Sequence, residues 1–467
     1  MSTVSLTEAP YVGTDRLLAG IVLSVLTFWL FAQSVINVVP VVKSSIDISL
    51  ETLTLAVSLS ALFSGCFVVA SGGLADKFGR VRLTLIGLML SIVGSALLVV
   101  SQGPMLFLAG RVVQGLSAAC IMPATLALIK TWYEGRARQR AVSFWVIGSW
   151  GGSGLCSFVG GAIATGLGWR WIFVFSIAAA LAAFLLIRGT PESRSATAAQ
   201  HKLDVSGLLS LVAGLVAGLV LFNLFISKGH HWGWTSGLSL SMLAGAVVAM
   251  GWFIRSGLRK KEAALIDFAL FNNRSYSAAV LSNLMLNGAI GTMMITSIWL
   301  QQGRHLSPFQ TGMMTLGYLV TVLLMIRVGE KLLQRYGARL PMMGGPAIAM
   351  VGIFLISCTF LETWTYIVTV FFSNVLFGLG LGCYATPSTD TAVTSAPENK
   401  VGVASGIYKM GSSLGGAFGL AMTASLYALF LPHGMAKAAQ YALWFNCTLC
   451  LGAIVVSALL LPRRRQS

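Results

Sequence analysis

Continuous apolar stretches recur along the whole sequence, and each is long enough to cross a lipid bilayer as a helix. Crossing about 30 Å of hydrocarbon takes roughly 20 helical residues. We therefore expect about fourteen membrane-spanning helices. Their approximate ranges are 17–40, 52–75, 81–101, 104–130, 140–166, 171–188, 205–227, 236–254, 277–300, 309–328, 341–361, 364–387, 401–431 and 439–461. Lipid rather than water must surround most of the chain.

The composition excludes an ordinary soluble domain. Hydrophobic residues make up 56% of the chain and charged residues 10%, and the mean hydropathy is +0.83. The runs are continuously apolar, whereas the strands of a membrane barrel alternate over about ten residues. We therefore expect an all-α membrane protein, in which many of the 51 glycines lie at close helix contacts.

Basic residues set the expected orientation. The net charge of +17 is spread loop by loop and not gathered on one element, which disfavours a nucleic-acid partner. With the N-terminus inside, the cations on the outer side are Lys43, Arg170, Lys228, Arg304 and Lys437, and those within spans are Arg111 and Lys409. All other Lys and Arg residues fall inside, so both termini are predicted to be cytoplasmic, in a cell inner membrane. Residues 1–16 lack the features of a cleaved signal peptide, which predicts an uncleaved first span.

Two longer polar connections, 189–204 and 255–276, divide the chain. The expected organisation is a cytoplasmic N-terminus (1–16), a six-helix bundle (17–188), linkers with two extra spans (189–276), a second six-helix bundle (277–461) and a basic cytoplasmic tail (462–467). The segments LADKFGRVR (74–82) and LLQRYGAR (332–339) follow the second span of each half and share a pattern, which supports an internal repeat.

The segment GGLADKFGR (72–80) joins the second and third spans at the predicted cytoplasmic face. It combines Gly72 and Gly79 with the carboxylate of Asp76 and the guanidinium of Arg80. One interpretation is a plain turn with positive-inside charges. The other is a conformational latch, in which Asp76 accepts bonds from an arginine or a helix N-terminus in one state and releases them in another. We expect the latch.

This segment closely resembles the loop signature of the major facilitator superfamily. RVVQGLSAA (111–119), VGGAIATGLGWRWIF (159–173), LSPFQTGMM (306–314) and VASGIYKMGSSLGGAFG (403–419) resemble segments of its fourteen-span drug:proton antiporter branch, so the likeness covers nearly the whole chain. It implies a major facilitator fold and multidrug efflux by alternating access, powered by the proton gradient without another cofactor. The sequence has no Gly-rich phosphate loop and no metal-ligand cluster, so neither an enzyme nor an ATPase domain is expected.

Three places depart from the pattern of that branch. The usual acidic residue of the first span is replaced by Ala32, and the usual Gly-Pro pair of the fifth span by Cys156 and Ser157. The usual arginine of the penultimate span is replaced by Ser412, while Lys409 stands about one turn earlier. Proton coupling is therefore expected to use a titratable group outside the first span.

Polar groups inside spans are the candidates for the cavity and for coupling, because an uncompensated polar atom in hydrocarbon is costly. These candidates are Gln33, Ser34, Asn37, Arg111, Gln114, Lys409 and Asp390. For the first-span residues the alternative role is interhelical hydrogen bonding, and for Arg111 it is a structural one. Arg111 cannot carry a proton, since a guanidinium stays charged, but it can hold a carboxylate.

Lys409 and Asp390 are the titratable candidates. Lys409 shares a helix face with Gly402, Gly406, Ser413 and Gly416, and this stripe of small residues favours packing on another helix. The alternative role for Lys409 is snorkelling, in which the ammonium reaches the membrane surface. The distance to the end of the span is some 12 Å, which is long for a lysine side chain. Asp390 is the carboxylate nearest the end of a span, and its alternative is a helix-terminal or loop role.

The expected function is proton-coupled efflux of amphipathic drugs or toxic organic compounds, by rocking of two bundles about a midplane site. The alternatives are a carrier for an organic anion or polar metabolite, and a non-transporting sensor or scaffold on a carrier fold. Since the spans hold Arg111 and Lys409 but no carboxylate well away from a helix end, substrates without a permanent positive charge are expected. The expected partners are a small-molecule substrate and membrane lipid.

Overall fold

The computed structural model describes residues 12–35, 50–194, 235–260, 268–306 and 308–462, with isolated positions within 42–48 and 214–233. Every regular element in this described part is a helix. The earlier helices are α1 (Asp15–Leu26), α3 (Leu50–Phe78), α4 (Arg80–Val99), α5 (Pro104–Trp132), α6 (Gly135–Val146), α7 (Gly152–Gly166), α8 (Arg170–Ile187) and α12 (Gly237–Lys260). The later ones are α13 (Arg274–Gly288), α14 (Gly291–Ile298), α15 (Pro308–Tyr336), α16 (Arg339–Ile356), α17 (Thr363–Ser395), α18 (Val401–Phe430) and α19 (Met435–Leu460).

Short π-helical segments interrupt or extend some spans. They are η1 (Thr27–Phe31) after α1, η3 (Ile147–Gly151) between α6 and α7, and η7 (Trp299–Gly303) after α14. The 3-10 turn η2 (Ala32–Ser34) follows η1. These segments change the helical register within the spans that contain them.

Twelve helical segments in the described part are long and apolar enough to cross a membrane, and the bent pair Gly135–Cys156 and Val159–Gly166, at 49°, brings the number to 13. The predicted span 205–227 lies almost entirely outside the described residues. The all-helical, multi-span architecture is therefore confirmed, while the total of about fourteen spans stays a prediction.

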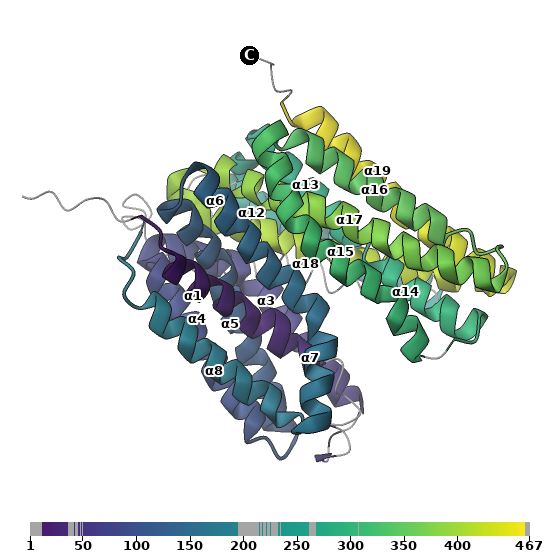
Figure 1. Cartoon of the computed structure of the whole chain (residues 1–467), viewed down its shortest axis with the longest axis horizontal. Coiled ribbons are helices and arrows are strands. Elements are labelled where there is room, and N and C mark those ends of the chain that lie inside the picture. The colour runs from purple at the N-terminus through teal and green to yellow at the C-terminus, as the bar shows by residue number, and fades with distance from the viewer. Residues whose placement is uncertain are drawn as a thin grey trace, which may run out of the picture.

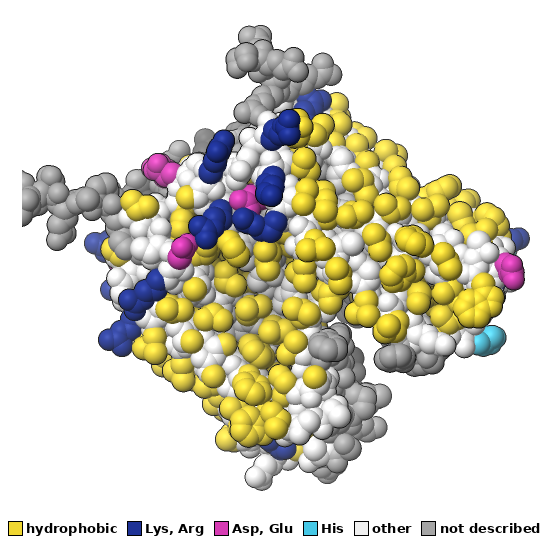
Figure 2. All heavy atoms as spheres, viewed as in Figure 1, with side chains coloured by type: hydrophobic (Ala, Val, Ile, Leu, Met, Phe, Trp, Pro, Cys, Tyr) yellow, Lys and Arg dark blue, Asp and Glu magenta, His cyan; other side chains and the backbone are white. Residues whose placement is uncertain are grey.

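The helices form two bundles that meet at one end and diverge towards the other (Figure 1). Helices α1 and α3 to α8 make the first bundle, and α13 to α19 make the second. Between the bundles α3 packs along α18, and α6 contacts α15 and α17. Lysines and arginines gather at the end where the bundles meet, and hydrophobic side chains cover the flanks (Figure 2). We call the first the basic end and the opposite one the far end.

The crossing of α3 and α18 depends on glycine. Gly402 lies directly against the backbone of Gly72, and a Cβ on Gly406 would lie 2.8 Å from the carbonyl oxygen of Val68. Backbones approach this closely only where neither helix carries a side chain. The predicted packing of this face on another helix is confirmed at both glycines, whereas Gly416, further along α18, faces open space.

We expect Gly402→Ala to separate α3 from α18, because the new Cβ overlaps the Gly72 carbonyl. Overpacking of this kind costs about 1–3 kcal/mol. Thermal unfolding of the purified protein and flux in proteoliposomes should show a lower melting temperature and slower transport. The matched control is Gly416→Ala in the same helix, which should leave both values unchanged. Equal losses in the two variants would contradict the close crossing.

Candidate functional site

An interbundle contact closes the basic end. Asp76, near the end of α3, accepts hydrogen bonds from the backbone N–H groups of Gly402 at 2.8 Å and Val403 at 3.2 Å. Gly402 and Val403 are the second and third residues of α18, whose amides have no partner within the helix and are normally satisfied by an N-cap side chain. A carboxylate of the first bundle therefore caps a helix of the second.

Arg80 extends this contact. Its Nε and Nη2 atoms donate to Asp76 Oδ1 at 3.2 and 3.0 Å. Its Nη2 also donates to the carbonyl of Glu398 at 2.9 Å, and its Nη1 donates to the hydroxyl of Thr131. Asp76 is 2% exposed and Arg80 6%. Removing one partner of such a buried pair typically costs about 3–5 kcal/mol, so the two groups depend on each other.

The two glycines of the predicted latch have backbone roles. Gly79 forms the turn from α3 to α4 with φ at +121°, a conformation that other residues rarely adopt. Gly72 provides the close contact with Gly402. The structure thus brings Gly72, Asp76, Gly79 and Arg80 together at the boundary between the bundles.

A second arm of contacts lies beside the first. Arg138 of α6 pairs with Asp390 of α17, with Nε and Oδ1 3.3 Å apart, and Lys130 of α5 donates to the carbonyl of Ala396. Helix α17 continues to Ser395, so Asp390 lies inside a helix. The predicted end of this span at residue 387 was too early, and the alternative of a loop role for Asp390 was wrong. We call Asp76, Arg80, Lys130, Arg138 and Asp390 the interbundle clasp.

Arg111 is fully buried inside the first bundle. Its guanidinium donates to the carbonyls of Ala56 at 3.1 Å and Ala32 at 2.7 Å. It also donates to Gln114 Oε1 at 2.8 Å and to the hydroxyl of Ser60 at 2.6 Å. Because neutral acceptors from three chain segments surround it, the contacts support the structural alternative for Arg111 and Gln114.

Of the remaining candidates in the first span, the structure describes Gln33 and Ser34 but not Asn37. The Ser34 hydroxyl is buried and donates to the carbonyls of Leu30 at 2.5 Å and Cys156 at 2.9 Å, which ties the first span to α7. Gln33 is half-buried, and Asn37 lies outside the described residues. The interhelical hydrogen-bonding alternative is thus supported for Ser34.

Lys409 lies at the boundary between the bundles, about 10 Å along α18 from Gly402. Its ammonium nitrogen is 5.4 Å from the ring centre of Trp29 and 5.0 Å from that of Trp145, which belong to η1 and α6 of the first bundle. The residue is 8% exposed, and its ammonium has no hydrogen-bond acceptor among the described residues. Two cation–π contacts hold a buried cation here, and this arrangement does not support the snorkelling alternative.

Neutral polar groups line the neighbouring core of the second bundle. The Tyr384 hydroxyl is 2.6 Å from the Ser282 hydroxyl and accepts from Ser388 at 2.9 Å, and the Tyr408 hydroxyl donates to Ser388 at 3.1 Å. From the sequence, Tyr384 and Tyr408 are candidates for an aromatic cavity, with packing as their alternative role. Sequence reasoning did not identify the serines of this network, nor Trp29 and Trp145, because such residues are ordinary packing residues in spans.

The buried carboxylates of the described residues all lie near the basic end. They are Asp76, Glu330 and Asp390, within about two turns of the ends of α3, α15 and α17. Each pairs with an arginine, Glu330 with Arg327. Deeper between the bundles the described charge is therefore positive, at Lys409.

Two helical bundles that meet at a clasp of buried ion pairs, with apolar flanks and polar interiors, define a multi-pass membrane transporter. The family model of the Major Facilitator Superfamily matches residues 17–271 and 277–467, and the chain belongs to this family. This membership confirms the expected fold and class, a transporter and not an enzyme.

Among its relatives, the chain is 51% identical over 458 residues to the Quinolone resistance protein NorB of Staphylococcus aureus strain MRSA252, covering 97% of both chains. The protein of the same name from strain COL is 50% identical over the same share. Among solved structures, the proton:xylose symporter XylE superposes with a TM-score of 0.68 at 15% identity, over 97% of this chain and 96% of that one. The human organic anion transporter MFSD10 superposes with a TM-score of 0.65 at 15% sequence identity, over 95% of this chain and 98% of that one. These two likenesses establish the fold alone.

We expect Asp76→Asn to loosen the clasp, because it removes the ion pair with Arg80 and the negative charge at the N-terminus of α18. Amide exchange at Gly402 and Val403 should become several-fold faster, and transport slower, with substrate binding retained. Hydrogen-exchange mass spectrometry of the peptide 399–406, equilibrium binding and flux measure the three effects.

The matched control for Asp76→Asn is Asp15→Asn. Asp15 pairs with Arg140 within the first bundle, and its side chain is 80% exposed. Exchange at 402–403 should be unchanged in this variant. The latch assignment is wrong if Asp76→Asn abolishes binding while bound substrate is transported at the normal rate.

Exchanging the charges of the second arm tests its pairing. Arg138→Asp and Asp390→Arg each place like charges side by side across the clasp, so each should slow transport. The double variant restores opposite charges and should recover most of the substrate counterflow, which needs no proton gradient. The same exchange at Asp15 and Arg140, a pair that is 80% and 51% exposed, is the control. It should have little effect, because exposed pairs contribute about 0–1 kcal/mol. A double variant no better than the single ones would rule out direct pairing.

Proposed function

We propose that this transporter exports amphipathic drugs across the cytoplasmic membrane of a bacterium, driven by the proton gradient. The observation that carries the proposal is the 51% identity to a quinolone resistance protein over 97% of both chains. A gradient-driven mechanism needs no bound cofactor, and the described residues contain no group of ligands for a metal ion.

The basic end is proposed to face the cytoplasm, with both termini on that side. The positive-inside rule supports this orientation, since lysines and arginines gather there (Figure 2). The beginning of α1 lies at this end, where Asp15 pairs with Arg140, and so does the end of α19, where Arg339 donates to the carbonyl of Ala458. With the clasp closed, the conformation is then outward-facing.

Alternating access follows from the reversibility of the clasp. In the closed state Asp76 holds the first turn of α18, and Lys409 lies against Trp29 and Trp145. Rocking of the bundles towards the inward-facing state separates these pairs, because each joins one bundle to the other. The same movement that admits a drug from the cytoplasm thereby exposes the Lys409 ammonium.

Lys409 is proposed to bind an acidic group of the substrate. Ring faces hold its ammonium in the closed state, and among the described residues no hydrogen-bond acceptor competes for it. A carboxylate would provide a charge-assisted hydrogen bond worth about 1.5–3 kcal/mol. The described buried carboxylates pair with arginines, so a permanent cation finds no acidic partner there. Zwitterionic or anionic substrates are therefore favoured, which also keeps an organic-anion carrier as the second candidate function.

We expect Lys409→Gln to weaken export of a zwitterionic fluoroquinolone about tenfold, as the loss of one charge-assisted hydrogen bond predicts. Proteoliposome flux under an imposed pH gradient measures the effect. The carboxyl ester of the same drug is the matched substrate control and should be transported equally by both proteins. Lys437→Gln, at an exposed lysine near the start of α19, is the control variant. A preference for a quaternary ammonium dye, unchanged by Lys409→Gln, would refute the assignment.

The same flux assay tests the energy source and the class of protein. Collapsing the pH gradient should stop accumulation of the drug, whereas a sensor or scaffold would show no flux at all. Coupling is proposed to bypass the first span, where Ala32 is buried and its carbonyl accepts from Arg111. Asp390 and Lys409 are the proposed coupling groups. Full pH-driven transport by Asp390→Asn would remove Asp390 from this role.

A further inference from the structure

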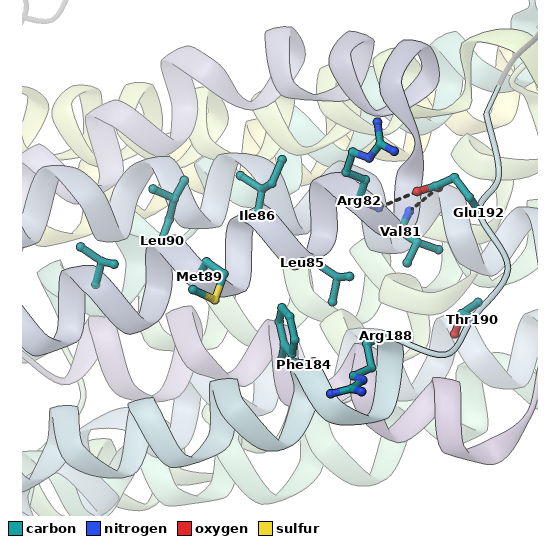
Figure 3. A pocket seen from close by; sticks show the side chains of 11 residues that line it. Val81, Arg82, Leu85, Ile86, Met89, Leu90, Phe184, Arg188, Thr190 and Glu192 are labelled. Atoms are coloured by element: carbon teal, nitrogen blue, oxygen red, sulfur yellow. Dashed lines mark hydrogen bonds between the residues drawn. The ribbon is translucent and has the colours of Figure 1, made fainter.

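A groove of about 490 Å³ lies between α4 and α8 on the flank of the first bundle (Figure 3). It belongs neither to the clasp nor to the surroundings of Lys409. Its apolar lining includes Leu85, Met89 and Val93 of α4 and Phe184 of α8. Met89 and Val93 are nearly half exposed. On the flank of a membrane protein, an open apolar groove of this kind contacts lipid chains rather than water.

The groove has the length of one lipid leaflet. Arg82, Leu85, Met89 and Val93 recur every three or four residues, so they follow one face of α4. From Arg82 to Val93 the helix rises about 16 Å, which is close to half of the roughly 30 Å hydrocarbon core. A single acyl chain can therefore lie along α4 with its headgroup at the level of Arg82.

The headgroup end of the groove is positively charged. Figure 3 shows Arg82 and Arg188 at the same end, on α4 and just after α8. Glu192 also lies there, but its carboxylate accepts from the N–H groups of Val81, Arg82 and Ser193, each at 2.9 Å. Its charge thus stabilises the N-terminus of α4. Both guanidiniums are exposed and have no acidic partner among the described residues.

We propose that this groove binds an anionic phospholipid of the cytoplasmic leaflet. The two arginine side chains point away from each other in Figure 3, but both are exposed and can turn towards a phosphate at this end of the groove. One acyl chain then follows Leu85, Met89 and Val93. Basic pockets between helices on the cytoplasmic side bind anionic headgroups through the same combination of charge and apolar wall. The proposal depends on the cytoplasmic orientation of the basic end and is independent of the transported substrate.

The bound lipid also supports the clasp. The first turn of α4 carries both Arg82, at the groove, and Arg80, in the clasp, and the Arg80 N–H donates to the carbonyl of Ser193 at 2.9 Å. A lipid that joins Arg82 to Arg188 fixes α4 relative to the segment after α8. It therefore holds Arg80 in position to pair with Asp76, which favours the closed basic end.

The test measures binding of dioleoylphosphatidylglycerol to the purified, delipidated full-length protein in mixed micelles, by native mass spectrometry and by the shift in melting temperature. We expect this lipid to bind more tightly than dioleoylphosphatidylcholine and to raise the melting temperature. The double variant Arg82→Ala/Arg188→Ala should bind it about thirtyfold more weakly, as the loss of two cations at the membrane surface predicts. Met89→Trp, which keeps both cations and fills the groove, should also lose the shift.

Two controls make the outcome decisive. Arg136→Ala/Arg255→Ala removes the same charge from two exposed arginines outside the groove and should bind phosphatidylglycerol normally. Glycerol 3-phosphate, an anion without acyl chains, should give no shift. An equal loss of binding in the control variant would show diffuse surface attraction only. If glycerol 3-phosphate gave the full shift in melting temperature, the groove would be an anion site without lipid specificity. If phosphatidylglycerol bound no more tightly than phosphatidylcholine, the two arginines would serve only as anchors at the membrane interface. Each of these results overturns the proposal.

Discussion

A charge inside a membrane protein must find a partner, and the pairing of Asp76 with the first turn of α18 is the place where this requirement organises the molecule. One carboxylate neutralises Arg80 and also satisfies two backbone amides that have no partner within their own helix. Both bundles contribute to the arrangement, so neither has it alone. We propose that this arrangement forms only while the basic end is closed, so that a change in the pairing shifts the conformation.

The two buried cations inside the spans, Arg111 and Lys409, differ in whether hydrogen-bond acceptors surround them. Arg111 is surrounded by carbonyl, amide and hydroxyl acceptors of its own bundle, so it stabilises packing in either conformation. Among the described residues, the Lys409 ammonium contacts only the ring faces of Trp29 and Trp145, which belong to the opposite bundle. We propose that these contacts are lost when the bundles separate, so that the surroundings of Lys409 change with the transport cycle.

The sequence predicts local features, such as spans and short motifs. It does not predict contacts between segments that are distant in the chain. Spans follow from hydropathy, and Asp76 and Arg80 stand four residues apart in a recognisable segment. Their partners in α5 and α18 come from distant parts of the chain, and no pattern identifies them. The premature end predicted for α17 has the same origin. Residues 388–391 are polar, as in a loop, but they are buried, and the Thr391 hydroxyl donates to the Pro387 carbonyl at 2.7 Å. Polar residues can continue a span where protein rather than lipid surrounds them.

Two irregular helical segments, η1 and η3, contain or adjoin the rings that contact Lys409. Trp29 lies within η1, and Trp145 lies two residues before η3. A π-helical turn has poorer hydrogen-bond geometry than an α-turn and persists where tertiary contacts hold it, which is often at functional sites. The α3–α18 crossing is the opposite case, with regular helices and backbones in direct contact through Gly72 and Gly402. Regular, closely packed helix can move as a rigid body, whereas irregular helix can adjust locally. We propose that the regular crossing moves as one rigid unit and that the irregular helix near Lys409 adjusts to the substrate.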